Sequence, residues 1–169
     1  ERMDVDGVVR FGRAAQVMRR LRRARLGMIG WNDMGLYTTA FDTVKLRRII
    51  GPEVESVDML QLERAMEKLD PAEVKREIAR VTKEWEYPLG KPGDEAIERA
   101  FRIYLATVGI CREKQFDAFS YKCVDGVDLE MNATHAVPSS LVADAGYPYI
   151  DENDVLNLAA ELMLKWLTG

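Results

Sequence analysis

The chain has 169 residues, of which 24 are Lys or Arg and 28 are Asp or Glu, so its formal net charge is −4. With 47% hydrophobic and 31% charged residues, the composition is that of a soluble globular domain and excludes a disordered or fibrous protein. No apolar run reaches the roughly 18 residues that a membrane span requires, and two cysteines with one histidine exclude a disulfide framework and a His-rich metal cage. We therefore expect one domain without a membrane partner, and two thiols suit the reducing cytoplasm.

The first 25 residues carry a net charge of +5, which leaves −9 for the rest of the chain. Their arginines alternate with apolar residues at the spacing of an amphipathic helix, and the cations gather toward its C-terminal end. A basic arm can track phosphates, but this stretch lacks the aromatic interleaving typical of nucleic-acid binding. We therefore expect residues 1–24 to form a connecting helix and expect no nucleic-acid partner.

Residues 26–31 (Leu-Gly-Met-Ile-Gly-Trp) form a short apolar run that is typical of a buried strand. From there, strand-like runs alternate with apolar residues at helical spacing. The expected elements are a helix ending before Gly51-Pro52, a strand over 54–59, helices over 62–69, 71–85 and 94–108, a strand over 116–123, a helix over 138–145, a strand over 147–150 and a helix over 155–167. Residues 25–169 are thus predicted to be a doubly wound α/β domain of the Rossmann or flavodoxin type, with a mainly parallel sheet of about four strands.

Ligands of such sheets bind beyond the carboxyl ends of the strands, near the point where the strand order reverses. Three predicted loops should lie there, namely residues 32–39, 124–137 and 151–154. Neither a G-x-G-x-x-G nor a G-x-x-x-x-G-K-[ST] motif occurs, so dinucleotide and P-loop nucleotide binding lose their usual support.

Cys123 ends a predicted strand, and His135, the single histidine, lies twelve residues later. A Cys-His nucleophile needs these side chains in contact and an electropositive setting, whereas a buried, inert cysteine is the commoner alternative. His135 can ligate a metal or shuttle protons, or simply bond to backbone or water. Asp128 and Glu130 share its loop and add carboxylate oxygens to this small group.

The acidic turn Asp151-Glu152-Asn153-Asp154 is the strongest local signal, because it follows a strand and opens a helix at the ligand-binding edge. Its hard oxygen donors suit Mg²⁺ or Mn²⁺ rather than soft metals. Capping of the helix accounts for Asp151 or Asp154. Capping does not require Glu152, which is therefore the candidate functional carboxylate.

This turn also belongs to a longer pattern. Asp151-Glu152-Asn153-Asp154-Val155-Leu156-Asn157, then Leu162-Met163, then Leu167-Thr168-Gly169 resembles a stretch of the L-fucose isomerases and their relatives, including the L-arabinose isomerases. In that family a Glu-Asn-Asp or Glu-Gly-Asp turn opens a helix that ends near Leu-Thr-Gly. More weakly, Arg25-Leu-Gly-Met-Ile-Gly, Met34-Gly35 and Phe41-Asp42 are similar to the first strand and loop of the family's middle domain.

The resemblance implies the middle domain of a Mn²⁺-dependent aldose–ketose isomerase of carbohydrate metabolism, which works through an enediol. It implies that Glu152 is a metal ligand and the proton-transfer residue, since a metal polarises the sugar oxygens while a carboxylate moves the proton. Asp154 would support the turn. The family's further acidic ligand and its ligating histidine fall outside these residues, so His135 is not that ligand.

Two consequences follow from the resemblance. The chain is expected to be a segment of a longer polypeptide that forms a homo-oligomer, and the isolated 169-residue fragment is expected to bind Mn²⁺ weakly and to be inactive. Two alternatives stay open. One is a non-catalytic α/β module that binds a sugar or small anion at the same sheet edge, and the other is a basic-arm protein that binds nucleic acid with a steep salt dependence.

Overall fold

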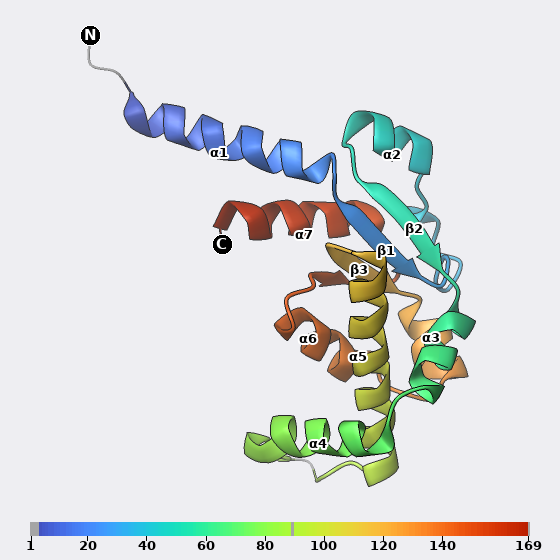
Figure 1. The fold of residues 1–169 in the computed structure, drawn as a ribbon. Coiled ribbons are helices and arrows are strands. Elements are labelled where there is room, and N and C mark those ends of the chain that lie inside the picture. The colour runs from blue at the N-terminus through green and yellow to red at the C-terminus, as the bar shows by residue number, and fades with distance from the viewer. Residues whose placement is uncertain (1–3, 89, 169) are drawn as a thin grey trace.

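One parallel sheet organises the chain, as a computed structural model of residues 4–88 and 90–168 shows (Figure 1). Its strand order is β2-β1-β3-β4, with β1 (Arg25–Ile29), β2 (Glu53–Val57), β3 (Ala118–Tyr121) and β4 (Tyr149–Ile150). The chain moves outward from β1 to β2, returns, and adds β3 and β4 on the other side of β1. The strand order therefore reverses between β1 and β3. The predicted four-stranded parallel sheet is confirmed.

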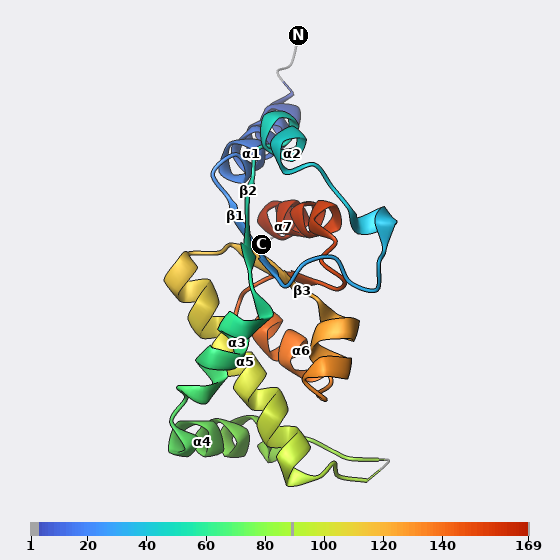
Figure 2. The ribbon, with the colours of Figure 1, turned by 90° about the vertical axis from the view of Figure 1, so that its right-hand side faces the viewer.

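Helices cover both faces of this sheet (Figures 1 and 2). One face carries α1 (Val5–Leu21), α2 (Thr43–Ile49) and α7 (Val155–Thr168), and the other carries α3 (Met59–Glu67), α5 (Asp94–Lys114) and α6 (Ala136–Asp144), with α4 (Pro71–Val81) packed on α5. Successive side chains of a strand point to opposite faces. Met28 accordingly belongs to the core under α7, and Ile29 belongs to the core under α5. The doubly wound arrangement is thus also confirmed.

The basic N-terminal stretch folds as α1, although residues 1–3 lie outside the described residues, as does Gly169 of the Leu-Thr-Gly motif. The buried residues of α1 are Val17 and Leu21 near its C-terminal end. There α1 packs on α7, with the Arg20 guanidinium 4.1 Å from the centre of the Trp166 ring. The N-terminal half projects beyond the sheet in Figure 1 and exposes several apolar side chains, namely Val5, Val8, Val9 and Phe11.

The segment after β3 differs from the predicted loop over 124–137. Its first half is a π-helix, Cys123–Glu130, with backbone bonds from Val127 N–H to the Lys122 carbonyl (3.1 Å) and from Met131 N–H to the Gly126 carbonyl (3.0 Å). Bonds of this i→i+5 type give no 3.6-residue periodicity in the sequence, so the segment showed no helical pattern.

Across the part of the chain that the structure describes, no helix has both the length and the apolarity of a membrane span.

Glu55 connects β2 to two neighbouring elements through its carboxylate. One oxygen lies 2.7 Å from Arg25 Nη2 of β1, and the other accepts a hydrogen bond from Lys114 Nζ of α5. The bond from Lys114, supported by the positive charges of Lys114 and Arg25, holds the pKa of Glu55 below its ordinary value of 4.5. This partly buried ion-pair network fastens one edge of the sheet to the helix that covers it.

Replacing Glu55 by glutamine is expected to lower the free energy of unfolding by about 1 kcal/mol at neutral pH. A carboxyl with a lowered folded-state pKa stabilises the fold above its unfolded pKa, and this stabilisation disappears as the pH falls through the folded value. Urea denaturation across the acidic range should therefore show the difference between wild type and Glu55→Gln shrinking toward zero. Glu53→Gln, at an exposed position of the same strand, is the control and should show little difference. A Glu55→Gln penalty that is independent of pH would contradict the ion-pair explanation.

Candidate functional site

Asp33 joins the segment after β1 to the π-helix that follows β3, at the reversal of strand order. Its fully buried carboxylate accepts hydrogen bonds from the backbone N–H groups of Val124 (2.7 Å) and Asp125 (2.9 Å) and from the Cys123 thiol (3.2 Å). Burial acts to raise the pKa of Asp33, but these hydrogen bonds outweigh it and hold the pKa below its ordinary value. Asp33 therefore caps the π-helix as a carboxylate. It was not among the predicted site residues, although an acid directly after a buried strand was a signal for it.

The acidic turn 151–154 is fastened to the carboxyl ends of β1 and β3 through Asn153. The buried Asn153 side chain donates from Nδ2 to the carbonyl oxygens of Ile29 (3.2 Å) and Trp31 (2.8 Å), and its backbone N–H donates to the Tyr121 carbonyl (3.1 Å). Glu152 and Asn153 both have left-handed backbone conformations, with φ of 61° and 54°. Such conformations cost non-glycine residues about 1–3 kcal/mol each and persist only where the surroundings impose them. The three bonds of Asn153 supply that constraint.

Helix capping distinguishes the roles of the two remaining candidate acids of the turn, Asp154 and Glu152. Asp154 caps α7, since its Oδ1 accepts the N–H of Asn157 (3.1 Å) and its Oδ2 accepts a bond from the Asn157 side chain (2.6 Å). Glu152 donates its backbone N–H to Cys123 Sγ (3.3 Å). The carboxylate of this partly buried residue has no hydrogen-bond or ion-pair partner within residues 4–88 and 90–168. Helix capping thus explains Asp154 and leaves the Glu152 carboxylate available.

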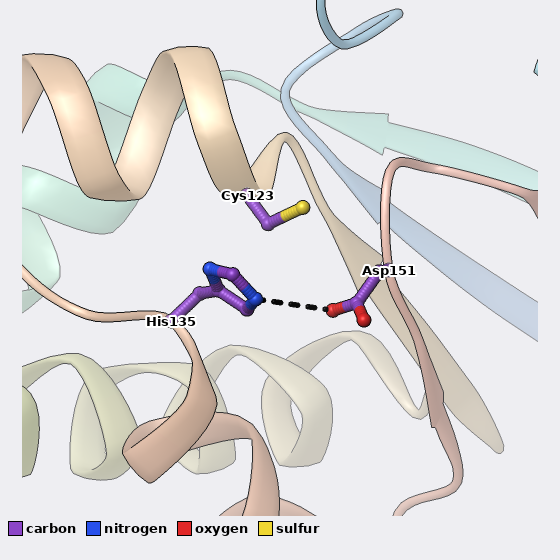
Figure 3. A group of neighbouring side chains, drawn as sticks. All are labelled: Cys123, His135 and Asp151. Atoms are coloured by element: carbon purple, nitrogen blue, oxygen red, sulfur yellow. Dashed lines mark ion pairs between the residues drawn. The ribbon is translucent and has the colours of Figure 1, made fainter.

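Three side chains with metal-ligating atoms come together beside this turn. Cys123, His135 and Asp151 each offer one such atom, and the three atoms all lie within 4.8 Å of one another. Figure 3 shows them reaching toward one another from three separate segments, the start of the π-helix, the residue before α6 and the end of β4, with His135 Nε2 and Asp151 Oδ1 3.6 Å apart. We call these three residues the Cys-His-Asp cluster. It forms where the predicted loops meet.

Asp128 fixes the orientation of the histidine in this cluster. Its carboxylate accepts the backbone N–H of His135 (2.8 Å) and lies 2.8 and 2.9 Å from the ring nitrogen Nδ1. With Nδ1–H donating to a carboxylate, the neutral imidazole presents the lone pair of Nε2 toward Asp151 and Cys123. Asp151 is held in turn, since its Oδ1 accepts a hydrogen bond from the Tyr149 hydroxyl.

The Cys123 thiol does not have the properties of an activated nucleophile. It is 1% exposed and donates to Asp33. Burial, and then the hydrogen bond to Asp33, raise the pKa of Cys123 to about 12. Nucleophilic cysteines have lowered pKa values and partly exposed sulfurs. The burial and raised pKa of Cys123 therefore argue against the Cys-His nucleophile that the sequence left open. They favour either an inert buried thiol or a metal ligand beside His135.

Glu130 is not among the residues that bond to His135 in the described part of the chain, and its supporting role stays a prediction. It lies at the last position of the π-helix, is exposed, and lines a surface pocket of about 650 Å³ together with Glu63 of α3 and Arg99 of α5. The turn of the π-helix directs Asp128 toward His135 and carries Glu130 to this other surface. Of the three acids in the predicted loop, Asp125, Asp128 and Glu130, only Asp128 bonds to the histidine.

The described residues do not by themselves form the oxygen-rich Mn²⁺ site that the resemblance implies. The ligand atoms within 4.8 Å of one another are a sulfur, a nitrogen and one carboxylate oxygen, and Glu152 is not among their residues. Mn²⁺ favours carboxylate, carbonyl and water ligands. Glu152 suits that ion as a single oxygen ligand, so the remaining ligands would have to come from outside these residues. No protein-family model matches the chain, and no curated protein matches it significantly.

Proposed function

We propose that this chain is the α/β domain of a Mn²⁺-dependent aldose–ketose isomerase and supplies Glu152 to its metal site. The observation that carries the proposal is the turn 151–154, which lies at the carboxyl edge of a parallel sheet, where such folds bind ligands. Glu152 is held there in a left-handed conformation, and its carboxylate is engaged by none of the described residues. Strained backbone of this kind is concentrated at functional sites.

In this function Glu152 binds the ion and moves the proton between the two sugar carbons. Mn²⁺, when bound, supplies the positive charge that polarises the sugar oxygens. A positioned carboxylate contributes by taking and returning the proton. Asn153 fixes the backbone of Glu152 against β1 and β3, and Asp154 anchors the following helix through Asn157. Three of the four residues of the turn thus have separate roles, one in chemistry and two in positioning.

The other ligands and most of the sugar contacts would come from further domains of the same polypeptide or from a neighbouring subunit of a homo-oligomer. The projecting half of α1 supports this part of the proposal, since it exposes Val5, Val8, Val9 and Phe11. Scattered exposed apolar residues are ordinary, but a contiguous apolar face on one helix marks an interaction surface. We infer that α1 connects this domain to another part of the protein.

The proposal is tested by replacing Glu152 with glutamine in the full-length protein and measuring Mn²⁺-dependent interconversion of a panel of aldoses and ketoses. Because the amide neither moves a proton nor binds Mn²⁺ well, kcat/KM should fall by about 10²–10⁴-fold. Glu161→Gln, a substitution of the same kind on α7, is the matched control and should retain activity. Full activity in Glu152→Gln would contradict the proposal. A wild-type protein that binds sugars without converting any of them would instead support the non-catalytic module.

A further inference from the structure

We propose that the Cys-His-Asp cluster, Cys123, His135 and Asp151, binds a Zn²⁺ ion at a site separate from the manganese site that Glu152 serves in the proposed function. The cluster supplies one thiol, one imidazole and one carboxylate within 4.8 Å. These are the three kinds of side chain that bind Zn²⁺ in proteins. The proposal does not depend on the isomerase activity, because none of the three residues has a role in it.

The separations within the cluster are close to those of a zinc site. Nitrogen and oxygen ligands at about 2.0–2.1 Å from a tetrahedral ion lie about 3.3 Å from each other. His135 Nε2 and Asp151 Oδ1 are 3.6 Å apart. The Cys123 sulfur lies within 4.8 Å of the other two ligand atoms, so shifts of about 1 Å in side chains bring all three into ligating range. Figure 3 shows the sulfur and the ring nitrogen facing the same space as the Asp151 carboxylate.

Neighbouring groups hold each ligand in an orientation suited to the ion. Asp128 accepts a hydrogen bond from Nδ1–H of His135, so the lone pair of Nε2 is available to the ion. This arrangement is typical of zinc-bound histidines. The Tyr149 hydroxyl donates to Asp151, and the backbone N–H of Glu152 donates to Cys123 Sγ. When the ion binds, Cys123 releases its proton to solvent and the thiolate becomes the ligand. The hydrogen bond from the thiol to Asp33 (3.2 Å) is then lost, and the positive charge of the ion offsets the repulsion between the thiolate and the Asp33 carboxylate. The N–H of Glu152 then bonds to a sulfur that carries negative charge.

The ligand types also determine which ion is expected. Thiolate and imidazole ligands favour Zn²⁺ and Co²⁺, whereas Mn²⁺ binds such sites most weakly of the first-row divalent ions. Three protein ligands leave a fourth position, and the Asp151 side chain is 54% exposed, so this position opens to water. The site therefore has the ligand count of an open zinc site rather than of a closed structural one.

Cobalt titration of the full-length protein tests the proposal directly, since Co²⁺ bound to a thiolate gives a charge-transfer band in the near ultraviolet. We expect this band to appear at one ion per chain and to disappear when Zn²⁺ is added. Cys123→Ser should abolish the band, whereas Cys111→Ala, at the other buried cysteine of the chain, should retain it. Circular dichroism of each variant is the control that tests whether the variant is folded.

Further variants separate this site from the proposed manganese site. His135→Gln provides a second ligand deletion should Cys123→Ser fail to fold, and Asp128→Asn should weaken cobalt binding about 10–100-fold through the histidine alone. Glu152→Gln should retain the band, because the Glu152 side chain is outside the cluster. The proposal is overturned if wild type gives no band, if the band survives the loss of Cys123, or if Mn²⁺ displaces Co²⁺ as readily as Zn²⁺ does.

Discussion

Asp33→Ala is expected to lower the free energy of unfolding by about 3 kcal/mol, a large fraction of the 5–15 kcal/mol typical of a domain. The substitution removes an acceptor that is 0% exposed and leaves the N–H groups of Val124 and Asp125 without a partner. Both N–H groups are partly buried, and a buried donor that loses its acceptor costs about 1–3 kcal/mol. Urea denaturation followed by circular dichroism measures the loss. Hydrogen exchange should further show the π-helix opening first.

Two further substitutions make this prediction specific. Asp33→Asn keeps one acceptor oxygen in nearly the same volume, so it should cost about half as much as alanine. Asp58 caps α3 through the N–H of Leu60 (2.9 Å) at an exposed position after β2. Asp58→Ala is therefore the matched control and should cost about 1 kcal/mol, the ordinary value for a helix cap. An Asp33→Ala penalty no larger than that of Asp58→Ala would show that Asp33 is only another cap.

The strands and most helices could be predicted because their burial imposes a readable pattern. β1 is covered on both faces, so it appears in the sequence as an uninterrupted apolar run, predicted at 26–31 and observed at Arg25–Ile29. α4 begins at Asp70-Pro71, where a capping side chain and a proline at the first turn coincide. In both places the local sequence and the tertiary environment favour the same structure.

The π-helix could not be predicted because its main constraint lies far away in the sequence. Asp33 bonds to Val124 across 91 residues. Periodicity and capping patterns compare each residue only with residues a few positions away in the sequence. The same helix places Asp128 against His135 and Glu130 at a surface pocket, so the sequence could not show which acid of the segment approaches the histidine.

The candidate site was predictable in position but not in composition. Parallel strands place the segments 32–39, 124–137 and 151–154 at one edge, and the structure brings them together there. The contact of His135 with Asp151 depends on how α6 returns to β4. No local sequence motif predicts the path of the chain from α6 to β4. The role of Asn153 was missed for a similar reason, because asparagine in an acidic turn looks like an ordinary turn residue.

Asn153→Asp is expected to be among the most destabilising substitutions in the chain, at about 4 kcal/mol or more. Asn153 Nδ2 donates to the carbonyl oxygens of Ile29 and Trp31, and the residue is 1% exposed. An aspartate would place a carboxylate oxygen against two carbonyl oxygens in a buried position, where each repels the others and no water intervenes. Urea denaturation at neutral pH, where an exposed aspartate is ionised, measures this loss.

Two other variants divide the effect between side chain and backbone. Asn153→Ala loses both side-chain bonds but adds no charge, and should cost about 2–3 kcal/mol. Asn153→Gly loses the same bonds but adopts φ near 54° without strain, so it should be about 1 kcal/mol more stable than alanine. The expected order of stability is therefore wild type, glycine, alanine, aspartate. An aspartate variant as stable as alanine would mean that the two carbonyl contacts do not hold the turn. Because Asp151 and Glu152 precede Asn153 directly, both proposed metal sites would then need another anchor.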